Sequence, residues 1–258
     1  MQNPTLSIVI PVRMDSADRL NNLLAVLGHV DGFGVPVLLL EADGAPRLTP
    51  HLSAFSHVSY EFVEDATEPF HRTRYINRLL RRTRSDIAAV WDADMFVPQA
   101  QMEQAVHLMT DTGATLVYPF DGRVFMLPPD QTRTLRREGI SLSRLRHLNL
   151  TPLLGRRSCG GIHMVWREQY LALGGENEKY VGWGPEDAER LRRVMIAGQR
   201  AEWLPQGAAY HLDHARNVAQ QSLNCPALVR MRREFVRECS MTRPEMLHYI
   251  QTELLPTS

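Results

Sequence analysis

AAVWDADMFVP (residues 88–98) is an apolar stretch that two carboxylates, Asp92 and Asp94, interrupt one residue apart. Residues 87–91 are short and apolar, which is typical of a buried strand. Isolated carboxylates are costly to bury, so Asp92 and Asp94 are expected to face a partner or a metal ion. Residues two apart on an extended strand project from the same face, and one divalent cation could therefore meet both carboxylates. The alternative is a helix cap followed by a carboxylate in a turn.

Other parts of the chain repeat the pattern of a short buried strand. The strands are expected at residues 6–12, 35–44, 58–64, 86–94 and 114–120. Apolar residues at helical spacing predict helices between them, at residues 15–28, 68–83 and 99–113. This alternation indicates an α/β fold with a mostly parallel sheet flanked by helices. Ligands bind beyond the carboxyl ends of the strands in such sheets, where the sequence places Glu41, Asp43, Asp92 and Asp94.

The remainder of the chain shows no repeat and no linker, so a single domain is predicted. Residues 133–157 are basic and weakly periodic, which predicts a helix followed by a mobile loop. Residues 225–240 predict an amphipathic helix with inward residues Leu228, Met231, Phe235 and Val236. Its basic face is either solvated or in contact with anionic lipid.

Composition excludes some classes of function. The 258 residues carry a formal net charge of +0, so there is no general electrostatic attraction to nucleic acid. The three cysteines form no CxxC pair, which fits a reducing compartment. The first apolar run is too short for a leader, and no run approaches the length of a membrane span. The expectation is a cytoplasmic protein with at most peripheral contact at the inner face of the membrane.

A second group of functional residues lies in VGWGPEDAERLRRV (residues 181–194). Glycines on both sides of Trp183 let the backbone bend and expose the indole ring. Pro185 suits the first helical position, with Glu186 and Asp187 in the first turn. An exposed indole beside two carboxylates suits a sugar, because the ring stacks on the apolar face of the sugar while the carboxylates bind its hydroxyls. The alternative is that the two acids only favour the helix dipole.

A third group lies in AYHLDHARN (residues 209–217), where His211 and His214 are three residues apart. The two rings share a face in a helix and point to opposite sides in an extended segment. Imidazole suits Mn, Zn, Fe and Ni. Three arginines near a strand end and a helix start suit phosphate or uracil contacts: Arg13, Arg72 and Arg74. The chain contains neither a GxGxxG motif nor a P-loop motif.

The motifs IPVR, FHRTRYIN, WDADMF, CGGIHMVWREQYLALGGENEKYVGWGPEDAE and HLDHARN occur in this order over residues 6–217. In these motifs the chain resembles GT-A fold glycosyltransferases, specifically the β-1,4-galactosyltransferase-like group and its bacterial family 2 relatives. The resemblance implies one Rossmann-like domain over residues 1–258. Residues 1–120 would bind the nucleotide sugar, and residues 121–258 would bind the acceptor and include the C-terminal helix.

The resemblance also implies roles for individual residues. Asp187 is the implied catalytic base, and Trp183, Gly184 and Glu186 are implied to bind the acceptor. The implied metal ligands are Asp94, His214 and His211, the last standing where animal enzymes have methionine. Ser158 and Cys159 replace two aromatic residues of the animal enzymes, which would make room for an N-acetylated donor. The residues expected to bind the nucleotide sugar are Pro11, Val12, Arg13, Glu41, Arg72, Asp92 and Gly161.

The predicted function is an inverting, metal-dependent transfer of a hexose or N-acetylhexosamine from a UDP-sugar to a hydroxyl of a glycan or glycolipid. Mn²⁺ is the expected cofactor, with Mg²⁺ as the alternative, and bacterial surface polysaccharide synthesis is the expected setting. Two other functions stay open at this stage. One is a non-catalytic, sugar-nucleotide-binding partner subunit of a polysaccharide synthase, and the other is a metal-dependent hydrolase of phosphate esters.

Overall fold

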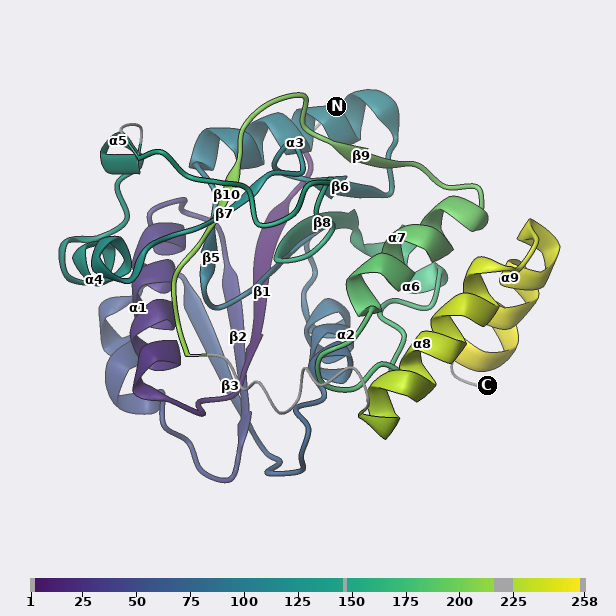
Figure 1. The fold of residues 1–258 in the computed structure, drawn as a ribbon, viewed down its shortest axis with the longest axis horizontal. Helices are drawn as coiled ribbons and strands as arrows, with labels where there is room; N and C mark the ends of the chain where they lie inside the picture. Colours follow the sequence, from purple (N-terminus) through teal and green to yellow (C-terminus); the bar gives the residue numbers. More distant parts are fainter. Residues whose placement is uncertain (1–2, 146–147, 216–224, 256–258) are drawn as a thin grey trace.

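A seven-stranded sheet in the order β3-β2-β1-β4-β8-β6-β9 forms the centre of the molecule (Figure 1). The computed structural model describes residues 3–145, 148–215 and 225–255. Four strands of the first half pair in parallel, and they are β1 (Leu6–Val12), β2 (Val37–Asp43), β3 (Val58–Glu64) and β4 (Ile87–Trp91). The predicted α/β fold with a mostly parallel sheet is confirmed.

The helices of the first half lie close to their predicted positions. They are α1 (Ala17–Asp31), α2 (Arg72–Arg82) and α3 (Gln99–Thr112), with a short 3-10 helix η1 (Thr49–Ala54). α1 continues beyond the predicted end at Gly28, because buried Val30 extends its apolar face. α2 begins four residues later than predicted, because residues 68–71 form the loop before it. α3 ends at Gly113, whose φ of 65° is a left-handed conformation that glycine adopts easily.

The second half of the sheet departs from the predicted parallel order. β8 (Ile162–Trp166) runs antiparallel to both β4 and β6 (Leu116–Tyr118), and β9 (Ala201–Trp203) then pairs in parallel with β6. Periodicity along a strand reports which residues are buried and contains no information on strand direction, so the sequence did not reveal this antiparallel strand.

A small second sheet in the order β5-β10-β7 lies over the carboxyl end of β4. Its strands are β5 (Met95–Phe96), β7 (Val124–Met126) and β10 (Ala209–His211), and β10 pairs antiparallel with β5. This pairing brings residues 92–96 beside residues 209–214, although more than a hundred residues separate them in the chain. The main-chain nitrogen of Leu212 donates to the carbonyl of Asp94 at 2.8 Å.

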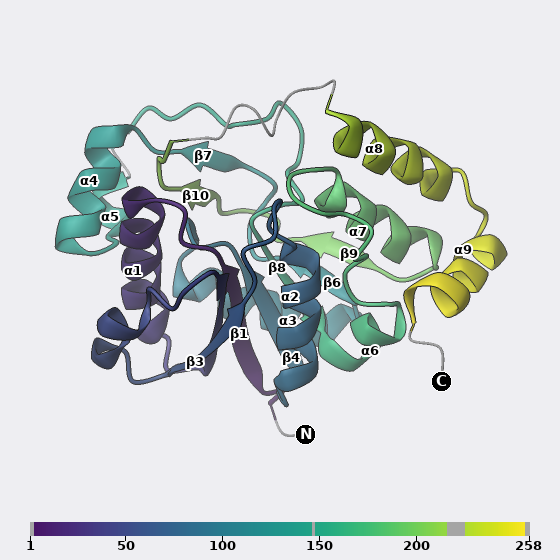
Figure 2. The same ribbon diagram turned by 90° about the horizontal axis from the view of Figure 1, so that it is seen from below.

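The remaining helices are α4 (Pro129–Glu138), α5 (Leu142–Leu145), α6 (Arg167–Ala172), α7 (Glu186–Ile196), α8 (Pro226–Cys239) and α9 (Arg243–Tyr249), followed by the π-helical turn η3 (Ile250–Leu254). α4 lies beside α1, whereas α8 and α9 lie beside α7 on the other side of the molecule (Figure 1, Figure 2). None of the helices formed by the described residues has the length and apolar character needed to cross a membrane.

The predicted C-terminal helix is confirmed as α8, but one of the four residues predicted to face inward is exposed instead. Leu228 and Met231 are buried as predicted, whereas Val236 is 63% exposed. Glu238 takes the inward position instead, because it accepts hydrogen bonds from Asn177, Tyr180 and Tyr249. A buried carboxylate with three donors is stable in the interior, although its residue type suggested a surface position.

Candidate active site

Asp94, His211 and His214 come together where β4 and β10 end. Asp94 lies in the turn between β4 and β5, His211 ends β10, and His214 lies in the loop that follows. His214 Nε2 lies 3.1 Å from Asp94 Oδ2, and His211 Nε2 lies 3.5 Å from Asp94 Oδ1. One ligand atom from each of the three residues lies within 4.8 Å of the other two.

The orientation of both imidazole rings suits a metal ion. His211 Nδ1 lies 2.7 Å from the carbonyl of Leu212, and His214 Nδ1 lies 2.8 Å from the carbonyl of Ala215. A carbonyl only accepts, so Nδ1 carries the proton in each ring, and the lone pair of each neutral ring is on Nε2. Two lone pairs and a carboxylate therefore face one another, an arrangement that a cation neutralises.

Asp94 is nearly buried, and its carboxylate is surrounded by positive charge. Burial acts to raise the pKa of Asp94, but His211, His214 and Arg19 outweigh burial and lower this pKa to about 2. When the His214 ring is protonated on both nitrogens, Nε2 donates to Asp94, and this hydrogen bond is the main reason that the pKa of His214 is raised. A bound metal ion would take the place of the proton on Nε2. The carboxylate is thus ionised over the physiological pH range, as a metal ligand must be.

Asp92 points away from this cluster, contrary to the expectation that both carboxylates share one face. Residues 92–94 form a turn in which the nitrogen of Met95 donates to the carbonyl of Asp92, so the strand geometry assumed from the sequence ends at Trp91. Asp92 Oδ1 instead accepts from Arg72, with Nε at 3.1 Å. Arg72 Nη1 also lies 4.0 Å from Asp187 Oδ1, so one guanidinium links the Asp-x-Asp turn to α7.

The Gly-Trp-Gly segment forms an exposed corner before α7. Gly182 has φ of 75°, and a Cβ there would lie 2.9 Å from Pro69, so only glycine fits this approach. Trp183 is 50% exposed. Gly184 lies against Met231 of α8, where an added Cβ would meet the sulfur at 3.0 Å. The predicted sugar platform is therefore available to a ligand, and α8 supports it from behind.

Glu186 and Asp187 occupy the first turn of α7, as predicted. Glu186 is only 9% exposed, and burial together with the charge of Asp187 raises the pKa of Glu186 to about 8. The Asp187 side chain is about one third exposed and lies against Gly160, where an added Cβ would be 2.4 Å from Oδ2. Asp187 is the more exposed of the two carboxylates.

Among the residues predicted to bind the nucleotide sugar, three lie at the end of β1 or beside the Asp-x-Asp turn, and two make their polar contacts with the protein itself. Pro11 and Val12 are buried at the carboxyl end of β1, and Gly161 has φ of 88° and packs against Met95, directly after the Asp-x-Asp turn. The guanidinium of Arg13 donates to the carbonyls of Ala42, Asp65 and Thr67. Glu41 is fully buried and accepts from the nitrogens of Arg47 and Leu48 and from the hydroxyl of Tyr60.

Arg13 and Glu41 are therefore engaged inside the protein, where they hold the loops after β3 and β2. Asn217, the last residue of the HLDHARN motif, lies outside the described residues.

Several buried charged residues beside the site were missed in the sequence. Arg190 and Glu176 are almost completely buried and pair at 2.8 and 3.0 Å, next to buried His163 and Tyr170. Burial and the charge of Arg190 lower the pKa of His163 to about 4, so its imidazole is neutral. The spacing of Asp187 and Arg190, three apart on one helix, was the signal available in the sequence.

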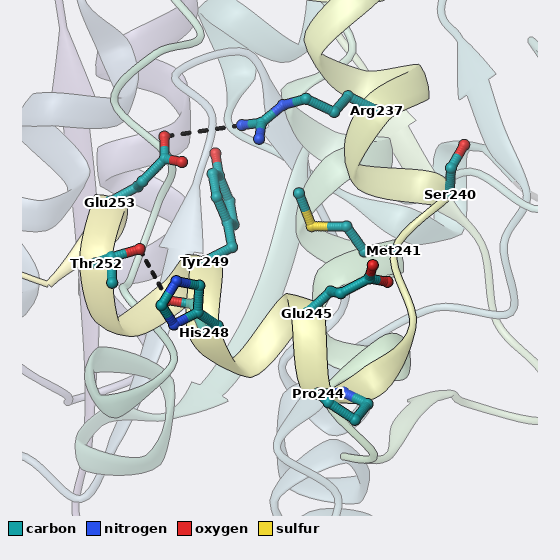
Figure 3. A pocket seen from close by; sticks show the side chains of 9 residues that line it. All are labelled: Arg237, Ser240, Met241, Pro244, Glu245, His248, Tyr249, Thr252 and Glu253. Carbon is teal, nitrogen blue, oxygen red and sulfur yellow. Dashed lines mark hydrogen bonds and ion pairs between the residues drawn. The ribbon is translucent and has the colours of Figure 1, made fainter.

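Two surface hollows lie away from this site, on the C-terminal helices. One, of about 610 Å³, lies between α8 and α9 and is lined by Arg237, Ser240, Met241, Pro244, Glu245, His248, Tyr249, Thr252 and Glu253 (Figure 3). The other, of about 320 Å³, is lined by Val229, Arg232, Arg233 and Val236 of α8. None of the residues predicted to be functional lines either hollow.

Known proteins resemble the chain in part of its sequence and in its fold. Residues 144–215 match the family described as the N-terminal domain of galactosyltransferase, a stretch that includes Gly161, Trp183, Asp187, His211 and His214. Among curated proteins, none matches the chain.

Solved structures with the same fold are numerous. A mannosyltransferase from Pyrobaculum calidifontis, in complex with GDP-Man and Mn²⁺, superposes with a TM-score of 0.60 at 17% identity, over 98% of this chain and 71% of that one. GalNAc-T7 with UDP, GalNAc and Mn²⁺ gives 0.58 at 14% identity, over 94% of this chain and 51% of that one.

A third similar structure is a mutant β-1,4-galactosyltransferase 7 from Drosophila in complex with manganese, UDP-Gal and xylobiose. It gives a TM-score of 0.55 at 16% identity, over 89% of this chain and 79% of that one. We conclude that the chain has the fold of GT-A glycosyltransferases and is similar to galactosyltransferases over residues 144–215.

Proposed function

We propose that the protein transfers a hexose or N-acetylhexosamine from a UDP-sugar to a hydroxyl of a glycan or glycolipid, with inversion at the anomeric carbon. One observation carries the proposal. Asp94, His211 and His214 form a cluster that could bind a metal ion. In the same turn as Asp94, Asp92 pairs with Arg72, which also lies near Asp187 in the helix that follows exposed Trp183. A donor-side group and an acceptor-side group thus lie at one edge of the sheet, as transfer between two bound sugars requires.

Asp94, His211 and His214 are the residues that would hold the metal ion. A carboxylate with two imidazoles suits Mn²⁺, whereas Mg²⁺ prefers oxygen ligands. Mn²⁺ is also the ion named with all three similar structures. A bound Mn²⁺ would act as a Lewis acid that neutralises charge on the leaving diphosphate.

The acceptor side of the reaction depends on α7 and the turn before it. Trp183 would stack against the apolar face of the acceptor sugar, and buried Glu186, protonated at neutral pH, would donate a hydrogen bond to it. Asp187 would take the proton of the acceptor hydroxyl as its oxygen attacks the anomeric carbon, with UDP leaving from the opposite face. Arg72, which lies near both carboxylates, would fix the position of Asp187 relative to Asp92.

The donor and acceptor are proposed at the level of chemical class. Two of the three similar structures are named with UDP or UDP-Gal and one with GDP-Man, so UDP is the favoured nucleotide. Ser158 and Cys159 are small residues next to Gly160, which touches Asp187. Small side chains at these positions would leave room for an N-acetyl group on the donor. Synthesis of a bacterial surface polysaccharide at the cytoplasmic face of the membrane is the setting proposed for this activity.

The first experiment measures UDP release with a panel of UDP-hexoses and UDP-N-acetylhexosamines, with and without Mn²⁺ and with a mixture of glycan acceptors. We expect release that requires both the metal and an acceptor. Release that needs no acceptor and is indifferent to the nucleotide base would instead favour a phosphate-ester hydrolase. Nucleotide-sugar binding with no turnover under any condition would favour the non-catalytic partner subunit.

Asp187→Asn is the variant that tests the role of the base. The amide keeps the shape of the side chain but cannot take a proton, so transfer should fall by about 100-fold or more, as is typical for loss of a general base. Binding of UDP and Mn²⁺, measured by calorimetry, should stay within about threefold of the wild type. Wild-type turnover in this variant would remove Asp187 from the proposed mechanism.

A further inference from the structure

Arg190 is the buried residue that contacts Asp187 from inside the protein. The two residues are three apart on α7 and therefore share one face of the helix. Arg190 Nη2 lies 3.0 Å from Asp187 Oδ1, and the Arg190 side chain is fully buried, whereas that of Asp187 is about one third exposed. Asp187 Oδ2 lies against Gly160, so the two oxygens of this carboxylate have different surroundings.

Glu176 holds the guanidinium of Arg190 from the other side. Arg190 Nε and Nη2 donate to the two oxygens of Glu176 at 2.8 and 3.0 Å, and Nη1 lies 3.5 Å from the carbonyl of Cys159. Glu176 in turn accepts from the hydroxyl of Tyr170 at 2.8 Å, and its main-chain nitrogen donates to Asn77 at 2.7 Å. A bidentate pair anchored on two helices leaves the guanidinium little freedom to rotate.

Removing a guanidinium from water is costly, so its position in the interior requires compensating charge. A single carboxylate, Glu176, is sufficient for pairing. The contact with Asp187 is additional, and it directs positive charge from the protein interior toward the carboxylate that faces the ligand. The neighbouring pair Arg193 and Glu189, equally buried, has no such contact: Arg193 donates to Glu189 at 2.6 Å and to the carbonyl of Gly175 at 2.6 Å.

We propose that Arg190 is a positioning residue that fixes the carboxylate of Asp187, with Oδ1 on the guanidinium and Oδ2 directed to the acceptor hydroxyl, and that Glu176 anchors Arg190 for this purpose. The inference rests on the proposed function of Asp187 as base. Arg190 reaches neither acceptor nor donor, since its side chain is fully buried. Its effect should therefore be on turnover, and binding of either sugar should change little.

The test compares two double variants that each replace a buried ion pair by neutral residues. Glu176→Gln with Arg190→Met removes the contact to Asp187, and Glu189→Gln with Arg193→Met removes the neighbouring pair as a matched control. Misplacement of a catalytic group by about 1 Å costs on the order of 100-fold, so the first variant should lose about 10- to 100-fold in kcat, with KM for donor and acceptor within about threefold. The control variant should keep kcat within about threefold.

Arg190→Lys provides the conservative variant. Lysine keeps the positive charge but lacks the planar guanidinium with its several donors. The kcat of this variant should therefore lie between those of the wild type and the double variant. The proposal is overturned by an unchanged kcat in the Glu176/Arg190 variant, or by an equal loss in the Glu189/Arg193 control. If circular dichroism shows that the Glu176/Arg190 variant is unfolded, Arg190→Lys decides, and wild-type kcat in that variant overturns the proposal.

The wild-type protein separates failure of this inference from failure of the proposed function. Absence of transfer by the wild type overturns both. Transfer by the wild type that Asp187→Asn abolishes, together with full kcat in the Arg190 variants, overturns only the role of Arg190.

Discussion

Glu186 and Asp187 are consecutive carboxylates that the fold places in different environments. Glu186 turns into the protein, where one of its oxygens is buried without a hydrogen bond from the described residues. Asp187 turns toward Gly160, and its Oδ1 lies 3.0 Å from Arg190 and 4.0 Å from Arg72, as ion pairs. Two consecutive carboxyl groups therefore differ in burial, and the raised pKa of Glu186 leaves it a neutral hydrogen-bond donor at neutral pH.

The environment of Glu186 predicts a pH-dependent stability. Its pKa rises from 4.5 in the unfolded chain to about 8 in the fold, through burial and the charge of Asp187. Between these two values the folded state holds a proton that the unfolded state has released, so the free energy of unfolding falls as pH rises. Glu186→Gln removes this dependence. The free energy of unfolding of the variant minus that of the wild type should therefore increase by a few kcal/mol from pH 5 to pH 8.5. One pKa unit corresponds to about 1.4 kcal/mol.

Urea unfolding at both pH values measures this change. Glu64→Gln, at an exposed position at the end of β3, is the control and should give the same difference from the wild type at pH 5 and pH 8.5. Parallel pH profiles of wild type and Glu186→Gln would contradict the prediction.

His214 makes the shortest contact within the proposed metal site, at 3.1 Å from Asp94. Loss of a residue that merely orients a metal ligand costs about 10- to 100-fold in affinity, and loss of a ligand should cost at least as much. His214→Ala is therefore expected to raise the Kd for Mn²⁺ by about 100-fold in calorimetry. His248→Ala, on α9, provides a matched histidine control with unchanged affinity. Equal Mn²⁺ affinity in both variants would rule out His214 as a ligand.

At the scale of elements, α4 and α8 support opposite sides of the active site. Arg136 of α4 donates to Asn22 and Asp18 of α1 and to the carbonyl of Asp213, and Thr132 accepts from the nitrogen of Asp213. α4 thus fixes the loop between His211 and His214. α8 packs against the Gly-Trp-Gly corner through Met231, which also accepts from the nitrogen of Val181.

The outer face of α8 carries three exposed arginines, Arg230, Arg232 and Arg233, and none forms an ion pair within the described part of the chain. Near an anionic bilayer each basic residue contributes about 1 kcal/mol of attraction. Substitution of all three by glutamine should therefore weaken sedimentation with phosphatidylglycerol vesicles by about 100-fold at low salt. A triple substitution of Arg78, Arg81 and Arg82 on α2 matches the charge change and should leave vesicle binding unchanged. Equal vesicle binding by both variants and the wild type would show that these three arginines do not contact lipid and that the face of α8 is simply solvated.

At the scale of the whole molecule, the proposed metal site joins segments from both halves of the chain. Asp94 belongs to the first half, His211 and His214 to the second, and β5–β10 pairing holds them together. A ligand that binds only this folded arrangement stabilises the whole domain.

Mn²⁺ at about 100 times its Kd should add about 2.7 kcal/mol to the free energy of unfolding, which for a chain of this size is a rise in Tm of about 5–10 °C. Scanning calorimetry of the wild type with Mn²⁺ or with a chelator measures the shift. An Asp94→Asn, His214→Ala variant serves as the reference and should show no rise. The same rise in that variant would mean that the stabilising ion binds elsewhere.

Much of the fold was contained in local sequence. The continuous apolar runs at β1, β2 and β4 predicted buried parallel strands, since both faces of each strand are covered. The GWGPED segment predicted an exposed tryptophan before a helix that begins with two acids, because glycine and proline restrict the backbone locally. The predicted metal ligands also come together, although that prediction rested on resemblance to a family.

Tertiary structure alone decided the features that depend on distant pairing. The pairing of β5 with β10, directly after the turn that separates Asp92 from Asp94, joins residues far apart in the chain. The antiparallel direction of β8 and the burial of Arg190 and Glu238 likewise depend on partners from other elements. Sequence determined which segments are buried strands and helices, because apolar spacing and backbone restriction act over a few residues. Only the folded chain decided which charged groups are buried together, because burying a charge requires partners that the packed elements bring beside it.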